Sequence, residues 1–221
     1  MCMTERMILL GDWQAISRRL QEDLAREMSP RRFIHTVGTG ETAYRLAVQW
    51  GADPERARLA ALAHDIAREW PSDRLLQACE EAGVPLEPWE RNQVELLHGY
   101  AGAWWAAKVY RLDDDEVLKA VRHHTIGHPG MALLEKIVYL ADKIEPNRAY
   151  KGVDRLRKLA GQSLDSAVLA CLDQAIEHVL RKGGLLHPLT VETRNRLILE
   201  RKREGMDSQQ HIEKTTEKPN R

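Results

Sequence analysis

A histidine and an aspartate stand side by side near the end of an otherwise apolar run, residues 59–67. His64 and Asp65 are the only side chains of this run that can make polar contacts, which indicates a helix buried on all sides. A buried carboxylate without partners is costly, so such groups persist mainly when they are paired or bound to a metal. The pair therefore suggests metal chemistry, and the rest of the chain must supply its partners.

Several other histidines near the ends of expected helices are candidate partners. Taken singly, each is more often a hydrogen-bonded core residue than a ligand. Neighbouring residues of a helix point about 100° apart and can converge on one ion near a helix end, which strengthens the interpretation for His64 and Asp65. The further histidines are His35, His98, His123 and His124.

Asp142 is a second carboxylate in an apolar helical stretch. Its alternative role is an ion pair with Lys143 or an arginine. Two carboxylates and several imidazoles in one small core would repel each other or require partners, and a divalent cation satisfies them together. Because no cysteine takes part, the donors suit iron, manganese, cobalt, nickel or a catalytic zinc.

The elements that must position these residues are helices. Ser29-Pro30, Asp53-Pro54 and Ser163 are helix-start signals, and we also expect caps at Asp12, Ser72 and Asp113. No alternating strand pattern and no internal repeat is present, so the fold class is all-α. The expected helices cover residues 13–28, 30–48, 54–70, 72–82, 89–97, 100–110, 114–124, 131–145, 164–182 and 191–203.

Gly38 and Gly40 lie inside the second expected helix, where each glycine costs about 1 kcal/mol relative to alanine. Two such costs predict that another backbone or side chain approaches closely there. The string 38–43 formally matches the dinucleotide fingerprint G-x-G-x-x-A, but no strand precedes it, so we reject that interpretation.

We expect one domain with two appendages. Residues 1–28 contain an amphipathic helix that packs on the domain, residues 29–203 form the domain, and residues 204–221 form a polar tail that we expect to be disordered.

Composition excludes several classes of function. Lys and Arg together number 33, as do Asp and Glu, so the chain lacks the basic excess of nucleic-acid binders. No window approaches the roughly 18 consecutive apolar residues of a membrane span. The three cysteines are isolated in sequence, which is typical of a reducing cytoplasm. We expect a cytoplasmic protein that binds neither nucleic acid nor membranes.

The order of the histidines and aspartates resembles that of the HD-domain metal-dependent phosphohydrolases, a superfamily of all-helical bundles, over about residues 20–200. The longer strings 95–99, 123–127, 129–131 and 134–148 are similar to one branch, the bacterial YqeK family of symmetrical diadenosine tetraphosphate hydrolases. This resemblance implies hydrolysis of diadenosine tetraphosphate to two ADP by a metal-activated water. It also implies one or two divalent ions, with iron expected and manganese, cobalt or nickel as alternatives.

The resemblance assigns roles by position. His35, His64, Asp65 and Asp142 match the family's metal ligands. His98 and His124 match catalytic positions that face the phosphates and could hold a second ion with Asp65 as the bridge, so Asp65, His98 and His124 are the expected catalytic residues. The implied nucleotide and phosphate contacts are Arg32, Arg68, His98, His124, Lys143, Arg148, His187 and Thr190.

Some positions depart from the family pattern. Arg68 stands where a lysine is expected, and Ile126 and His128 stand where threonine and arginine are expected. His123 is expected to end a helix without acting as a ligand. These departures affect the expected phosphate contacts and leave the metal ligands intact.

Two other functions remain open from the sequence. The same centre could serve another nucleotide phosphohydrolase or a nucleotidase, or the chain could be a non-catalytic nucleotide-binding or adaptor module. The complete ligand set disfavours the second, because a binding module does not need every metal ligand. A dinucleoside polyphosphate is the expected small-molecule partner, and the tryptophan-rich faces leave a homodimer open.

Overall fold

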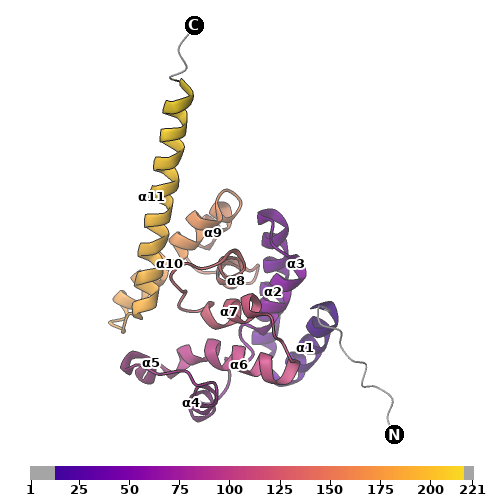
Figure 1. The fold of residues 1–221 in the computed structure, drawn as a ribbon. Helices are drawn as coiled ribbons and strands as arrows, with labels where there is room; N and C mark the ends of the chain where they lie inside the picture. Colours follow the sequence, from indigo (N-terminus) through magenta and orange to yellow (C-terminus); the bar gives the residue numbers. More distant parts are fainter. Residues whose placement is uncertain (1–12, 217–221) are drawn as a thin grey trace.

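The structure, a computed structural model, describes the backbone of residues 13–216 and the side chains of residues 13–203. Within that range every regular element is a helix, which confirms the all-α prediction (Figure 1). The elements are α1 (Trp13–Glu27), α2 (Pro30–Trp50), α3 (Pro54–Ala63), α4 (Ser72–Glu81), α5 (Pro88–Asn92), the short 3-10 helix η1 (Val94–Leu97), α6 (His98–Tyr110), α7 (Asp115–His123), α8 (Leu133–Ile144), α9 (Val153–Ala160), α10 (Leu164–Arg181) and α11 (Pro188–Thr216).

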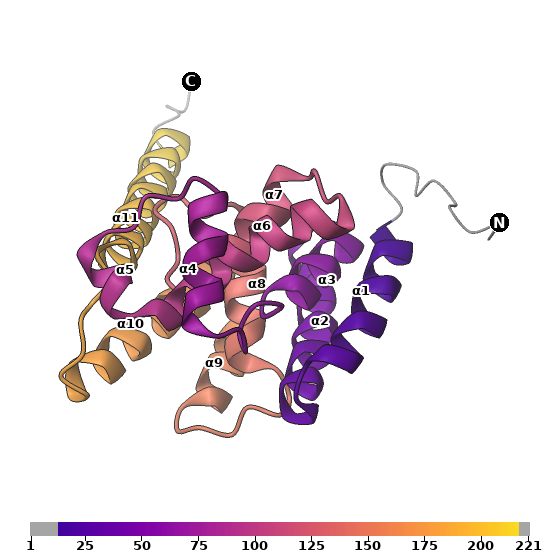
Figure 2. The same cartoon turned by 90° about the horizontal axis from the view of Figure 1, so that it is seen from below.

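Helix α8 lies at the centre of the bundle. It packs against α2, α3, α7, α9 and α10, and the figure places it between the α1–α3 group and the α10–α11 pair (Figure 2). Its side chains from Ile137 to Ala141 are fully buried, including the large ring of Tyr139. The buried face of this helix also carries Asp142 into the core.

Helix α1 covers the outer side of α3 and α2. Ile16, Leu20 and Leu24 form its buried stripe, at the spacing of one helix face. Asp12, the expected cap of this helix, lies outside the described residues.

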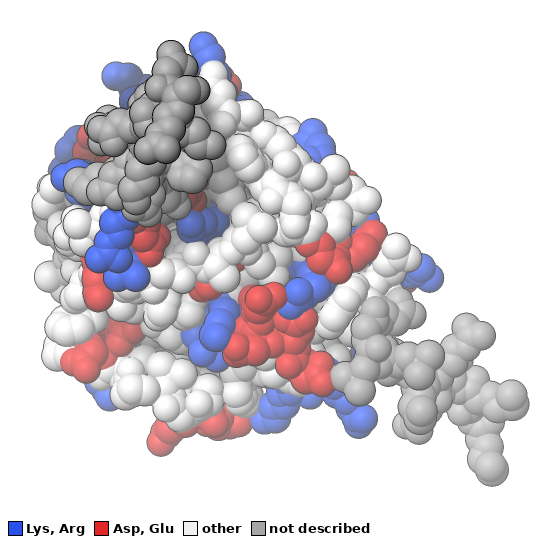
Figure 3. Space-filling model, turned by 45° about the horizontal axis from the view of Figure 1, so that its top comes forward, with Lys and Arg blue, Asp and Glu red and all other residues white. Residues whose placement is uncertain are grey.

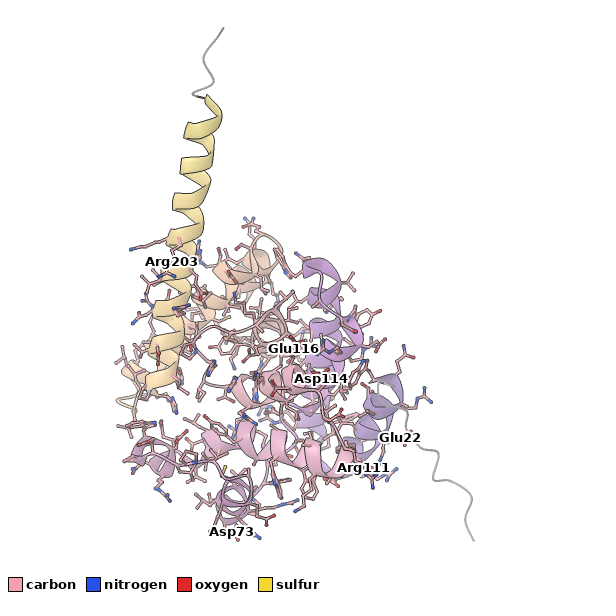
Figure 4. The ribbon with its side chains drawn as sticks, viewed as in Figure 1. Glu22, Asp73, Arg111, Asp114, Glu116 and Arg203 are labelled. Carbon is pink, nitrogen blue, oxygen red and sulfur yellow. The ribbon has the colours of Figure 1, made fainter. Side chains whose placement is uncertain are left out.

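Three of the expected caps are present, and two lie one residue away. Ser29, Asp53 and Ser163 each accept a hydrogen bond from a backbone N–H of the first turn. The cap of α7 is Asp114, not Asp113, and Arg56 of α3 pairs with both Asp114 and Glu116, labelled in Figure 4. The cap of α4 is Pro71, so Ser72 is its first helical residue.

Other boundaries also differ from those expected. Helix α3 ends at Ala63 and residues 64–69 form turns, so the apolar run is not one helix to Trp70. The expected helix 89–97 is divided into α5 and η1. Helix α9 was not predicted, because the glycine at 152 and its mixed charges gave no clear start signal.

Gly38 and Gly40 are sites of close approach, as their place in a helix predicted. A Cβ built on Gly38 would lie 2.7 Å from a carboxylate oxygen of Glu145. One built on Gly40 would lie 3.3 Å from the side chain of Leu62, so this glycine allows α2 and α3 to pack tightly.

Helix α11 is longer than the expected helix 191–203 and extends beyond the other helices (Figure 1). Its helical backbone continues to Thr216 and so covers most of the segment for which we expected disorder. Residues 204–216 contain no proline, so every residue of this segment can donate the backbone hydrogen bond that a helix requires. Residues 217–221 lie outside the described part of the chain.

On the face drawn in Figure 3, acidic side chains gather near the middle and basic side chains lie next to them. Among the described residues, no helix combines the length and the apolar character that crossing a bilayer requires.

Candidate metal centre

The first half of the centre is built from α2, the turn after α3, and α8. His35 lies in the second turn of α2, His64 and Asp65 begin the turn after Ala63, and Asp142 lies near the end of α8. The Nε2 atom of His35 is 3.0 Å from Asp142 Oδ1 and 3.6 Å from Asp65 Oδ2. His64 Nε2 is 3.3 Å from Asp65 Oδ2 and 3.7 Å from Asp142 Oδ1, so the four donors converge.

The second half adds His98, the first residue of α6, and His124, which directly follows α7. Their Nε2 atoms are 3.0 Å apart and lie 3.3 and 3.7 Å from Asp65 Oδ1. Asp65 therefore turns Oδ2 toward His35 and His64 and Oδ1 toward His98 and His124. This is the arrangement of a carboxylate placed between two groups of ligands.

The Nδ1 atoms of the four histidines all face acceptors. His64, His98 and His124 are each bound to the carbonyl of the residue three positions earlier, at 2.5, 2.6 and 2.7 Å. His35 Nδ1 instead contacts Glu145 Oε1 at 3.1 Å. Since an acceptor requires Nδ1 to carry the proton, each ring would present the lone pair of Nε2 to the centre once it is in its neutral form, as metal binding requires.

A close contact between two helices brings the second half together. A Cβ built on Gly99 would lie 2.5 Å from the backbone oxygen of Arg122, so only glycine allows α6 and α7 to approach this closely. His98 directly precedes Gly99, and His124 lies two residues after Arg122.

Three cations surround the carboxylates. Arg32 Nη1 is 2.6 Å from Asp65 Oδ2, and Lys143 Nζ is 2.5 Å from Asp142 Oδ2. Arg148 Nη2 is 2.6 Å from Asp142 Oδ1. Asp142 therefore forms ion pairs with Lys143 and with an arginine, which is the alternative role that the sequence left open for it. All three side chains are partly exposed, which leaves them accessible to an anionic ligand.

The electrostatics keep the carboxylates ionised. Burial alone would raise the pKa of Asp65, but the imidazoles of His64 and His98 hold that pKa well below its ordinary value. Burial would lower the pKa of His64, but Asp65 and Asp142 raise it to about 10. Burial, together with His64 and His98, holds the pKa of His124 well below its ordinary value.

The donor set fits a divalent metal. His64 Nε2 is fully buried and points into the cluster. It lies 3.3 Å from Asp65 Oδ2 without the geometry of a hydrogen bond, so an ion between the two atoms would complete both. The sets His35, His64, Asp142 and His64, Asp65, His124 each offer ligand atoms within 4.8 Å of one another. Imidazole nitrogens and carboxylate oxygens are ligands for first-row divalent ions.

Two cavities open beside the centre. The Arg32 cavity has a volume of about 890 Å³ and is lined by Arg32, His35, Arg148 and Tyr150, among others. The His187 cavity, of about 800 Å³, reaches Thr125, Lys143 and Tyr150 at one end. The rest of its wall includes Leu96, Ile126, Cys171, Ala175, Val179, Leu185, Leu186, His187 and Thr190.

The residues expected to contact the nucleotide lie in different parts of the site. Lys143, His187 and Thr190 line the His187 cavity, while Arg32 lines the other and Arg148 reaches the centre. His187 is also packed against Glu90 at 3.4 Å, and Thr190 donates to the carbonyl of Ile126, so both residues also fix the start of α11.

Arg68 differs from the other expected contacts. It lies in the turn after Asp65, lines neither cavity, and makes no side-chain hydrogen bond or ion pair to the centre among the described residues. Its backbone N–H donates to the carbonyl of Asp65, which is a structural role in the turn.

Three residues of the site were not given roles from the sequence. Glu145 orients His35, and Thr125 Oγ1 lies 3.1 and 3.0 Å from the Nε2 atoms of His98 and His124. Glu69 binds the backbone and hydroxyl of Ser29 and so ties the turn after Asp65 to the start of α2. The only sequence signal was proximity to a ligand, as in Glu145 three residues after Asp142.

Comparison with known proteins places this centre in a family. The HD domain model matches residues 32–147. A symmetrical bis(5'-nucleosyl)-tetraphosphatase of Bacillus subtilis is 38% identical over 172 residues, which cover 78% of this chain and 92% of that protein. The enzyme of the same name from Staphylococcus aureus is 30% identical over 175 residues, covering 78% and 90% of the two chains.

A solved structure is also similar. A predicted HD superfamily hydrolase involved in NAD metabolism from Clostridium acetobutylicum superposes with a TM-score of 0.81 at 43% identity, covering 83% of this chain and 97% of that one. The chain therefore belongs to the HD-domain family, in the group that contains the symmetrical bis(5'-nucleosyl)-tetraphosphatases of Bacillus subtilis and Staphylococcus aureus.

Proposed function

We propose that this chain hydrolyses diadenosine tetraphosphate symmetrically, releasing two molecules of ADP. The observation that carries the proposal is the position of the His and Asp cluster beside two cavities of similar volume, about 890 and 800 Å³. The substrate has two nucleosides joined by four phosphates. Both cavities include Tyr150 in their walls, and each reaches the centre, one through His35 and the other through Lys143 and Thr125, so together they could receive the two nucleosides of one substrate.

The His187 cavity supports a nucleoside site. Its wall combines apolar side chains such as Ile126 and Leu186 with the charged groups of Lys143, Lys151 and Arg155 near its rim. Ligand sites typically pair an apolar surface with a few polar groups that fix orientation. The apolar part is suited to a base and the cations to the phosphates that follow it.

The Arg32 cavity is the more polar of the two. It presents Arg31, Arg32, Asn147 and Arg148, and it reaches the centre through His35. We propose that it receives the other end of the substrate. Guanidinium groups bind phosphate oxygens in a planar, two-pronged geometry, which is why arginine suits this role.

His35, His64, Asp65 and Asp142 are the proposed ligands of a first ion, and His98 and His124 with Asp65 those of a second. A bound divalent ion would lower the pKa of its water toward about 7 and polarise the phosphoryl oxygen under attack. The donor set is our reason for proposing iron, with manganese, cobalt and nickel as substitutes.

The cations next to the carboxylates have a second task in this proposal. Arg32, Lys143 and Arg148 now contact Asp65 or Asp142. When those carboxylates serve as ligands, these side chains are free to turn to the polyphosphate and offset the negative charge that builds during phosphoryl transfer.

A cytoplasmic location also belongs to the proposal, and the buried thiols of Cys79 and Cys171 are free.

The test is a product analysis. The purified full chain, supplied with iron, manganese or cobalt, should convert diadenosine tetraphosphate to ADP alone, as measured by anion-exchange chromatography. Formation of ATP and AMP would overturn symmetrical cleavage. Turnover of mononucleotides only would indicate a different nucleotide phosphohydrolase.

The Asp65→Ala variant tests the centre itself. It should lose metal, counted by elemental analysis, and at least about 100-fold of kcat, since it removes a proposed ligand of both ions. Asp73→Ala is the matched control, because Asp73 is exposed at the start of α4 (Figure 4). Full activity of Asp65→Ala would refute the metal mechanism.

A further inference from the structure

A second cluster of metal-type donors lies between α7 and α8, outside the centre described above. It consists of His123, His128 and Glu135, and we call it the α7–α8 cluster. His123 Nδ1 is 2.6 Å from Glu135 Oε1, and the rings of His123 and His128 stack at 4.5 Å between centroids with 15° between planes. One ligand atom from each residue lies within 4.8 Å of the others.

The cluster faces away from the first centre although the two are adjacent in sequence. His124 points to Asp65, while its neighbour His123 points to the first turn of α8. Successive residues at a helix end diverge by about 100°, so one pair of histidines supplies two different sites.

Two members of the cluster are held rigidly. His123 and Glu135 are buried, at 8% and 4% exposure. Glu135 Oε2 accepts a hydrogen bond of 2.8 Å from the backbone N–H of Ala132, which leaves Oε1 directed at His123. Because a 2.6 Å hydrogen bond joins these two atoms, an ion bound by both would replace the proton on His123 Nδ1 and move the two atoms slightly apart.

His128 is the adjustable member. It sits at the surface on the turn 124–130, which includes Gly127 at φ 76° and closes through a hydrogen bond from Gly127 N–H to the carbonyl of His123. A surface imidazole can rotate about its side-chain bonds at little cost. The stacked ring can therefore bring a nitrogen toward Glu135 without moving the backbone.

We propose that His123, His128 and Glu135 bind a divalent transition-metal ion, with Zn²⁺ the best match. Two imidazole nitrogens and one carboxylate oxygen form a three-ligand zinc set, and water would fill the fourth, solvent-facing position. The ion would tie the turn between α7 and α8 to both helices. That turn also carries Thr125, whose hydroxyl touches His98 and His124, so the second site would stiffen one wall of the first.

Zinc counting on the full-length protein tests the proposal. After dialysis against buffered zinc, wild type should retain one equivalent more than His128→Ala. In calorimetric titrations with zinc alone, the same substitution should weaken the corresponding binding step by about tenfold or more. His128 is at the surface, so the variant should keep the circular dichroism spectrum of wild type.

His178→Ala is the control for the loss of an imidazole, since His178 lies on α10 far from this cluster in sequence and should leave the zinc count unchanged. A second readout uses Co²⁺, whose intense visible absorption in four-coordinate sites should fall in His128→Ala. Equal zinc counts and affinities in wild type and His128→Ala would overturn the proposal and leave the His123 and Glu135 contact as an ordinary ion pair.

Discussion

Glu145 determines the orientation of His35 through one side-chain contact, unlike the backbone contacts of the other histidines. Its second oxygen accepts hydrogen bonds from the backbone and side-chain N–H groups of Asn147, at 2.7 and 3.0 Å, so both carboxylate oxygens have partners. Glu145 is 1% exposed, and it is the residue directly after the last residue of α8.

Replacing Glu145 by glutamine should weaken metal binding about 10- to 100-fold, because an amide cannot accept hydrogen bonds through both of its terminal atoms. Calorimetric titration with manganese measures this loss. Glu200→Gln serves as the control, since Glu200 pairs with Arg196 on α11, away from the centre. If Glu145→Gln bound manganese as tightly as wild type, the orienting role of Glu145 would be refuted.

Residue types and spacing pointed to His64, Asp65 and Asp142 with several histidines as candidate partners, and the family resemblance selected His35, His98 and His124 among those histidines. The sequence could not reveal the roles of Thr125 and Glu69. Thr125 contacts His98, which is distant in sequence, and Glu69 accepts a hydrogen bond from Ser29 at the start of α2. The site at His123 was also hidden, since a histidine next to a proposed ligand is most simply interpreted as ending its helix.

At the scale of elements, the crossing of α6 and α7 depends on Gly99. In Gly99→Ala the new methyl would meet the backbone oxygen of Arg122, which cannot rotate away. We expect a loss of about 1–3 kcal/mol in the free energy of unfolding, together with reduced kcat, because His98 and His124 would be pushed apart.

Urea denaturation measures the stability of this variant, and Gly161→Ala is its control. A Cβ on Gly161 would meet its nearest neighbour at an ordinary 3.6 Å, and its φ of −77° suits alanine. Equal stability of Gly99→Ala and Gly161→Ala would show that α6 and α7 can separate without cost.

Helix starts were predictable where a cap side chain and proline occur together, as at Ser29 and Asp53. The end of α3 was not, because residues 64–69 contain no glycine or proline to mark the start of a turn. The tertiary hydrogen bonds of Glu69 to Ser29 hold that turn in place.

At the scale of the whole molecule, the proposed ligands come from α2, α6, α8 and the segments after α3 and α7. An ion bound only by the folded state stabilises it by about 2.7 kcal/mol at a hundredfold excess over Kd. Chelation should therefore lower Tm by about 5–11 °C, measured by calorimetry.

Asp65→Ala is the control for chelation, because without the ions of the Asp65 centre its Tm should fall less than that of wild type when the chelator is added. A wild-type Tm that does not respond to chelation would contradict the proposed ligand set.

The homodimer suggested by the tryptophans stays a prediction. Trp70 and Trp105 pack edge to face beneath Arg74, which already covers part of that surface.

The backbone contacts of His64, His98 and His124 have a consequence for how the sequence can vary. The atoms that orient these rings are the carbonyls of Ala61, Glu95 and Val121, which every amino acid possesses. Substitutions at those positions that preserve the helix leave ligand orientation intact. The centre is thereby tolerant of mutation around three of its histidines, and its vulnerability is concentrated at His35, whose orientation requires the particular side chain of Glu145.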